Sequence, residues 1–169
     1  VVGGKNDLDG QGIISILYGK GDGTFKNKID MPADKYPVDI QVVDIDNDGF
    51  PDIVTCNSAA QTVTIFINQK SSFKAKDPIK IKGEPGAVGV GDFNKDGKLD
   101  LAVLVGATKE LNIFKGGGYK LVATKVLDLA PVAMRVNDYA DGGFANIMIA
   151  YSDTSDVSLI GANENKNNK

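Results

Sequence analysis

Two nine-residue loops carry oxygen-bearing side chains at matching positions and could bind a metal ion. Each has Asp or Asn at positions 1, 3, 5 and 9, with a glycine at position 6 that permits a sharp turn. Calcium takes about six to eight oxygen ligands, and side chains at positions 1, 3 and 5 of a tight loop converge on one point. With the backbone carbonyl at position 7, the predicted ligands are Asp44, Asp46, Asp48, Phe50 and Asp52 in the first loop, and Asp92, Asn94, Asp96, Lys98 and Asp100 in the second.

Runs of Asp, Asn and Gly also form ordinary turns, so one such loop alone would leave both interpretations open. Two loops in register favour calcium, because a cluster of unneutralised carboxylates repels itself. They are not EF-hands, since position 12 is Thr55 or Val103 instead of a bidentate glutamate. A third loop, at 138–146, has Ala140 and Gly142 at positions 3 and 5. We expect it to keep the turn and lose the metal.

The loops recur within a longer repeat, because Asp44, Asp92 and Asp138 are separated by 48 and then 46 residues. Three further position classes follow the same spacing: Pro37, Pro85 and Pro131; Phe25, Phe73 and Tyr119; and Tyr18, Phe66, Phe114 and Ile160. Alternating apolar residues precede each aspartate, and a short apolar run follows each loop, as strands require. We expect third strands at 62–68, 110–115 and 157–160, and less regular fourth strands near 74–81 and 121–127. Four antiparallel strands in a repeat of about 40–50 residues are typical of a propeller blade.

The sequence therefore predicts an all-β fold, a β-propeller of four-stranded antiparallel blades with about three and a half blades present. Propellers close with about four to eight blades, so we expect an incomplete ring. Further blades would come from the same polypeptide, another copy or another chain. We expect the C-terminal strands of a first blade at 1–31, a second blade at 32–81 and a third at 82–127. The second blade would contain loop 44–52 and the third loop 92–100. A partial fourth blade at 128–161 would contain the degenerate loop, and a tail would follow at 162–169.

Segments 44–54 and 92–103, with the turn at 21–25 upstream, resemble FG-GAP/VCBS repeats, the calcium-binding blades of integrin-alpha-type propellers. The resemblance covers essentially residues 1–160. It implies seven-bladed propellers as the commonest form, an extracellular setting, and roles in adhesion or ligand binding. The same family includes lectins and enzymes that carry such propellers.

The composition argues against several classes of function. The chain has no histidine, which excludes a Ser-His-Asp triad, a Cys-His pair and a His-ligated metal within it. A net charge of -3 argues against a nucleic-acid partner, and no apolar run reaches the length of about 18 residues that a membrane span needs.

Cys56 aligns with Leu104 and Ala150 and is expected to be a buried apolar residue. Matched strand positions place Tyr18, Phe66 and Phe114 in the core between blades.

We therefore expect a non-catalytic module that is stabilised by two calcium ions and serves adhesion or recognition. Its ligand would be a protein or a glycan bound at the propeller face. Extracellular modules bind calcium at about 10⁻⁴–10⁻³ M, so we expect a secreted or cell-surface location. Two alternatives stay open. A lectin is less favoured because the chain has no tryptophan and only 7% aromatic residues. A scaffold domain of a larger extracellular enzyme would need its catalytic groups elsewhere.

Overall fold

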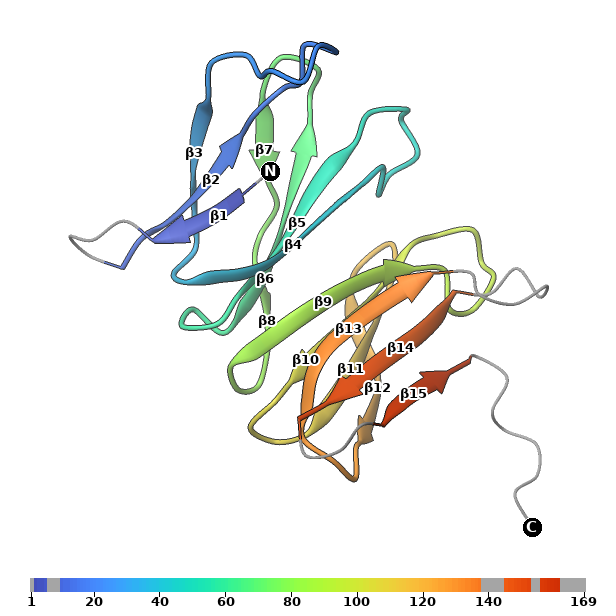
Figure 1. Cartoon of the computed structure of the whole chain (residues 1–169). Coiled ribbons are helices and arrows are strands. Elements are labelled where there is room, and N and C mark those ends of the chain that lie inside the picture. The colour runs from blue at the N-terminus through green and yellow to red at the C-terminus, as the bar shows by residue number, and fades with distance from the viewer. Residues whose placement is uncertain (1, 6–9, 138–144, 153–155, 162–169) are drawn as a thin grey trace.

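The computed structural model describes residues 2–5, 10–137, 145–152 and 156–161, and these residues form four antiparallel sheets in chain order (Figure 1). The first sheet contains β1 (Val2–Lys5), β2 (Gly12–Ile16) and β3 (Ile29–Ala33). The second contains β4 (Pro37–Val43), β5 (Asp52–Asn57), β6 (Thr62–Asn68), β7 (Phe73–Ala75) and β8 (Ile79–Lys80). The third contains β9 (Pro85–Gly91), β10 (Asp100–Val105), β11 (Glu110–Lys115) and β12 (Lys120–Val126). The fourth contains β13 (Pro131–Asn137), β14 (Asn146–Tyr151) and β15 (Val157–Ile160).

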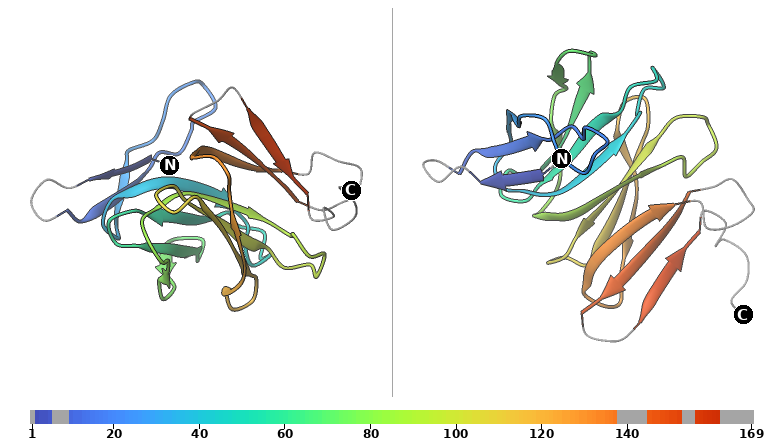
Figure 2. Two further views of the ribbon diagram at one scale, coloured as in Figure 1. Left: turned by 90° about the horizontal axis from the view of Figure 1, so that it is seen from below. Right: turned by 45° about the horizontal axis from the view of Figure 1, so that its top comes forward.

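The sheets are arranged as the blades of a β-propeller whose ring is incomplete (Figure 2). One strand from each sheet lies near the common centre, so that β1 contacts β4, β4 contacts β9 and β9 contacts β13. Within each sheet the strands follow one another outward in chain order, except that β7 and β8 both pair with β6. This arrangement confirms the all-β propeller expected from the repeat. The described residues contain no helix of the length and hydrophobicity that crossing a membrane requires.

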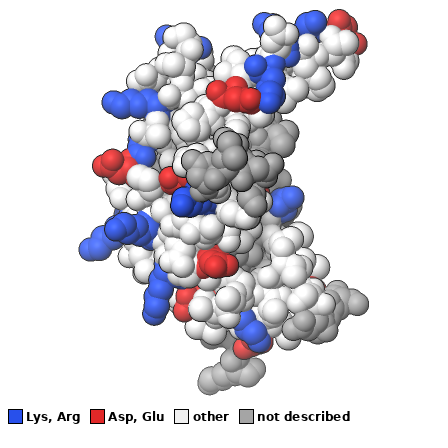
Figure 3. All heavy atoms as spheres, turned by 90° about the vertical axis from the view of Figure 1, so that its left-hand side faces the viewer, with Lys and Arg blue, Asp and Glu red and all other residues white. Residues whose placement is uncertain are grey.

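The surface mixes charges of both signs. On the face shown in Figure 3, acidic side chains lie among the lysines, and the described residues form no single large basic cluster there. The expectation that the chain binds no nucleic acid stays a prediction.

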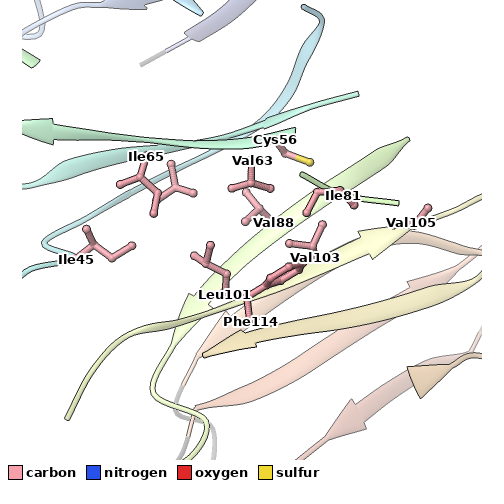
Figure 4. Close-up of a cluster of buried hydrophobic side chains, with 11 residues drawn as sticks. Ile45, Cys56, Val63, Ile65, Ile81, Val88, Leu101, Val103, Val105 and Phe114 are labelled. Carbon is pink, nitrogen blue, oxygen red and sulfur yellow. The ribbon is translucent and has the colours of Figure 1, made fainter. Parts of the chain in front are cut away.

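Apolar cores fill the spaces between successive sheets. In the core between the second and third sheets, Val63 and Ile65 face Leu101 and Val103 (Figure 4). Every residue of β5 and of β10 is buried, because neighbouring sheets cover both faces of these strands. Full burial explains why the sequence shows continuous apolar runs at these two strands instead of alternation.

One of the three aromatic residues predicted to lie in the core is exposed. Phe66 and Phe114 are buried, and each packs toward the preceding sheet, whereas Tyr18 is 44% exposed. Strand β2 ends at Ile16, so Tyr18 lies beyond it. No described strand precedes the first sheet and could cover the tyrosine ring. The expectation that Tyr18 belongs to the core is therefore wrong for the described part of the chain.

Glycines let the central strands approach closely. A Cβ atom added to Gly89 would overlap the Val136 side chain, and one added to Gly91 would overlap Ala145. Side chains larger than hydrogen at these two positions would push β9 away from the fourth sheet. The small residues before the second loop thus reflect close packing near the centre of the propeller.

A carboxylate joins the second and third sheets across their central strands. Asp39 on β4 accepts a hydrogen bond from the Val88 backbone N–H on β9 at 2.9 Å, through its Oδ2. Its Oδ1 accepts a second bond from the Ile40 N–H at 2.9 Å. The repeat places Ala87 and Ala133 at the equivalent positions, so this contact is specific to one pair of blades.

Cys56 is fully buried in the core between the second and third sheets, as expected. Burial, and in addition the negative charge of Asp39, raises the pKa of its thiol from about 9 to about 12. A protonated, enclosed thiol is a poor nucleophile. The residue therefore acts as a small apolar side chain.

We expect this thiol to make the protein less stable as the pH rises above about 9. Above that value the unfolded thiol loses its proton while the folded thiol keeps it up to about pH 12, so the stabilisation present at lower pH is progressively lost. Urea unfolding at pH 8 and pH 10 checks this expectation. Cys56→Ala should start less stable but lose less stability between the two pH values. Equal losses in both proteins would contradict the expectation.

Candidate metal centre

The first loop joins β4 to β5 and brings three of its predicted ligands together. Oxygen atoms of Asp44, Asp46 and Asp48 all lie within 4.8 Å of one another. The Asp44 carboxylate accepts hydrogen bonds from the backbone N–H groups of Asp48 at 3.1 Å and Gly49 at 2.8 Å. Gly49 has a φ of 89°, a left-handed conformation that glycine adopts without strain. These backbone bonds fix the Asp44 carboxylate, and a bond from the Phe50 N–H to Asp48 Oδ1 at 2.9 Å fixes the Asp48 carboxylate.

The second loop joins β9 to β10 and has the same backbone design. The Asp92 carboxylate accepts bonds from the Asp96 N–H at 3.3 Å and the Gly97 N–H at 2.9 Å. These donors occupy the same loop positions as Asp48 and Gly49. Position 4 is left-handed in both loops, with a φ of 60° at Asn47 and at Lys95. The repeat therefore extends from the sequence to the conformation of the loops.

The aspartate at position 9 is buried in both loops, and its carboxylate binds backbone N–H groups. Asp52 accepts bonds from Ile45 N–H at 3.0 Å and from Asn68 N–H at 2.7 Å, each on a different oxygen. Asp52 thereby ties the start of its loop to the end of β6. The sequence predicted Asp52 only as a metal ligand.

Asp100 repeats this arrangement in the third sheet. Its Oδ2 accepts a bond from Phe93 N–H at 3.1 Å, and its Oδ1 accepts one from Gly116 N–H at 2.6 Å. The side-chain amide of Asn94 also donates to Oδ2, at 3.2 Å. Asp52 and Asp100 hold the same position in the repeat, and each is the first residue of a fully buried strand. That shared position is the signal that could have revealed this role.

A lysine reaches the second loop. The Lys115 ammonium lies 3.1 Å from Asp96 Oδ2 and holds the pKa of the Asp96 carboxyl below its ordinary value.

Position 7 is Phe50 in the first loop and Lys98 in the second. The Lys70 ammonium lies 5.0 Å from the Phe50 ring centroid. The predicted metal role of position 7 belongs to the backbone carbonyl and stays a prediction.

Part of the third loop, residues 138–144, lies outside the described residues, as does the tail at 162–169. Asn146 is described at the start of β14, where it is buried like Asp52 and Asp100. The expectation that this loop has lost its metal stays a prediction.

A groove of about 920 Å³ lies between the second and third sheets, beside the first loop. Ile67 and Leu99 contribute apolar surface, Asp46 and Lys74 contribute charge, and Tyr119 lies in the wall. Burial, with the negative charges of Asp52, Asp100 and Asp46, raises the pKa of Tyr119 to about 12. The tyrosine hydroxyl therefore keeps its proton further into the alkaline range than an ordinary tyrosine, and a protonated hydroxyl can donate a hydrogen bond.

The strand order and the paired loops define a propeller built from Asp-rich repeats, and comparison with known proteins identifies the repeat. A family model described as FG-GAP-like repeat matches residues 1–55 and 44–103. The chain belongs to this family.

Two individual proteins are similar over part of their length. Integrin alpha-6 of Gallus gallus is 32% identical over 85 residues, which cover 42% of this chain and 8% of the integrin. The crystal structure of BBS1N in complex with ARL6DN, soaked with lead, has a TM-score of 0.59 at 16% identity. That match covers 91% of this chain and 53% of BBS1N, and it supports the fold alone. The chain thus spans a small part of the integrin and about half of BBS1N.

Proposed function

We propose that this chain is a calcium-stabilised, non-catalytic propeller module that recognises a protein ligand outside the cell or at its surface. The observation that carries the proposal is the convergence of Asp44, Asp46 and Asp48 within 4.8 Å, in a loop whose conformation recurs at 92–100. Carboxylate and carbonyl oxygens are hard ligands, which suit calcium. The donor set therefore fits the ion that the family resemblance implies.

In this proposal each loop would hold one ion. The ligands in the first loop would be Asp44, Asp46, Asp48, the Phe50 carbonyl and Asp52. Those in the second loop would be Asp92, Asn94, Asp96, the Lys98 carbonyl and Asp100. Calcium would neutralise each carboxylate cluster. The position-9 aspartates already bind backbone N–H groups of the adjoining strands. Through them, the loop would transmit its rigidity to β6 and β11.

Exposed valines on β4 support the further proposal that additional strands complete the propeller. Val38 and Val42 are 50% and 53% exposed, although Ile40 on the same face packs against the core of the first sheet. On β9, Val88 and Val90 align with Ile40 and Val42, and both pack in the core shared with the second sheet. A further central strand beside β1 would cover the two valines. It would come from the same polypeptide, another copy or another chain.

The similarity to an integrin alpha chain supports adhesion or recognition as the role and an extracellular or cell-surface location. The groove beside Tyr119 favours one alternative, a glycan ligand, because it combines an aromatic ring with polar groups at a boundary between blades. A glycan array separates the two: selective binding that Tyr119→Ala abolishes would favour the lectin.

Isothermal titration of calcium into the ion-free chain tests the metal proposal. We expect two ions to bind per wild-type chain. The double variant Asp46→Ala with Asp48→Ala and the double variant Asn94→Ala with Asp96→Ala should each bind one ion. Asp77→Ala is the matched control, because Asp77 is exposed and lies outside both loops. It should leave both sites intact. A chain that takes up no calcium at about 5 mM, well above the range for extracellular modules, would overturn the proposal.

A further inference from the structure

The two loops differ in a contact that the repeat itself makes visible. Lys115, the last residue of β11, forms an ion pair with Asp96 at 3.1 Å. The equivalent residue of the second sheet is Ile67, which is partly buried against the core and carries no charge. One molecule therefore contains a loop whose carboxylate pairs with an ammonium group and a closely matched loop whose described carboxylates form no ion pair; the Lys70 ammonium lies against the Phe50 ring instead.

The second loop also has fewer carboxylates and more internal contacts. Position 3 is Asn94 where the first loop has Asp46, and the Asn94 amide donates to Asp100 Oδ2 at 3.2 Å. Two of its ligand positions, Asp96 and Asp100, are thus engaged by positively polarised nitrogen groups. Among the described residues, the carboxylate cluster that offers three oxygens within 4.8 Å lies in the first loop.

The Lys115–Asp96 pair is accessible to solvent, which allows it to exchange. The two side chains are 52% and 30% exposed, so no apolar shell holds the ammonium in place. Exposed ion pairs contribute about 0–1 kcal/mol, and such a bond opens readily when a stronger cation arrives. A divalent ion at the loop centre would repel the ammonium while attracting the same carboxylate.

We infer that Lys115 is a built-in competitor for calcium at the second loop, and that the first loop fills at lower calcium concentration than the second. This inference rests on the proposed calcium function. Lys115 neutralises Asp96 when the ion is absent and leaves the carboxylate when the ion binds. The work of displacing it weakens the second site. The module then has a half-loaded state over an intermediate range of calcium concentration.

The test isolates the second site in the full chain by Asp46→Ala with Asp48→Ala and measures its calcium dissociation constant by titration calorimetry. Lys115→Ile copies the residue that the repeat has at position 67, and Lys115→Arg preserves the ion pair. Lys120→Ile is the matched control, because Lys120 lies directly opposite Lys115 on β12. It removes one unit of charge from the same edge and leaves the ion pair with Asp96 in place.

We expect Lys115→Ile to tighten calcium binding by about three- to tenfold, and Lys115→Arg and Lys120→Ile to change it by less than about twofold. Equal effects of Lys115→Ile and Lys120→Ile would overturn the inference and leave the calcium proposal standing. A wild-type chain that binds no calcium would overturn both. Unfolding curves in chelator verify that each variant is folded, and Lys115→Gln replaces Lys115→Ile if it is not.

Discussion

Replacing Asp100 with alanine is expected to lower the free energy of unfolding by about 3–5 kcal/mol, even in calcium-free buffer. The carboxylate is 1% exposed and accepts backbone bonds from Phe93 and Gly116. Alanine would leave the half-buried Phe93 N–H and the buried Gly116 N–H without an acceptor, and each lost bond to a charged group costs about 1.5–3 kcal/mol. Urea unfolding in the presence of chelator measures the change.

Asp96→Ala in the same loop is the control for this prediction. This variant loses the exposed ion pair with Lys115 and an exposed hydrogen bond from the Lys98 N–H, both of which water can replace, so we expect a cost of only about 1 kcal/mol without calcium. Asp100→Asn should fall between the two, because asparagine keeps one acceptor oxygen. If Asp100→Ala and Asp96→Ala cost the same in chelator, the position-9 carboxylate has no structural role apart from the metal.

Saturating calcium is expected to raise the midpoint of thermal unfolding by about 10–20 °C. At about 100 times the dissociation constant, one site that binds only the folded state contributes about 2.7 kcal/mol, so two sites contribute about 5. For a chain of this size each kcal/mol shifts the midpoint by about 2–4 °C. Scanning calorimetry in about 10 mM calcium and in chelator provides the measurement.

Magnesium is the matched control for the thermal experiment, because it demands octahedral geometry and gives up its water reluctantly. It should shift the midpoint much less than calcium at the same concentration. The variant with alanine at positions 46, 48, 94 and 96 should be insensitive to calcium. A wild-type shift below about 2 °C, despite two ions bound in the titration, would show that calcium does not stabilise the fold.

The fold was predictable because its information is repeated along the chain. Prolines and aromatic residues in one register set the period, and the third strands lie at 62–68, 110–115 and 157–160 as expected. The fourth strand of the second sheet is less regular. It breaks between Ala75 and Ile79, because Pro78 has no N–H to donate to a sheet.

The candidate site was predictable only in part. Local spacing was sufficient to bring Asp44, Asp46 and Asp48 together, since loop geometry depends on near neighbours. The acceptor role of Asp100 depends on Gly116, sixteen residues away in the turn between β11 and β12, and was missed. The Lys115 contact had no signal either, because the same position in the preceding repeat is isoleucine. The roles of these residues in binding metal, and the division of the chain into blades, stay predictions.

The strand order has a consequence for how the protein is made. Every pairing within the third and fourth sheets joins strands that follow one another along the chain. No pairing in these sheets waits for a distant segment, so each hairpin can close soon after its second strand leaves the ribosome. Asp100 must wait for Gly116 before both of its oxygens are satisfied. The propeller would then fold one blade at a time during synthesis, and each new blade would cover the apolar face of the blade before it.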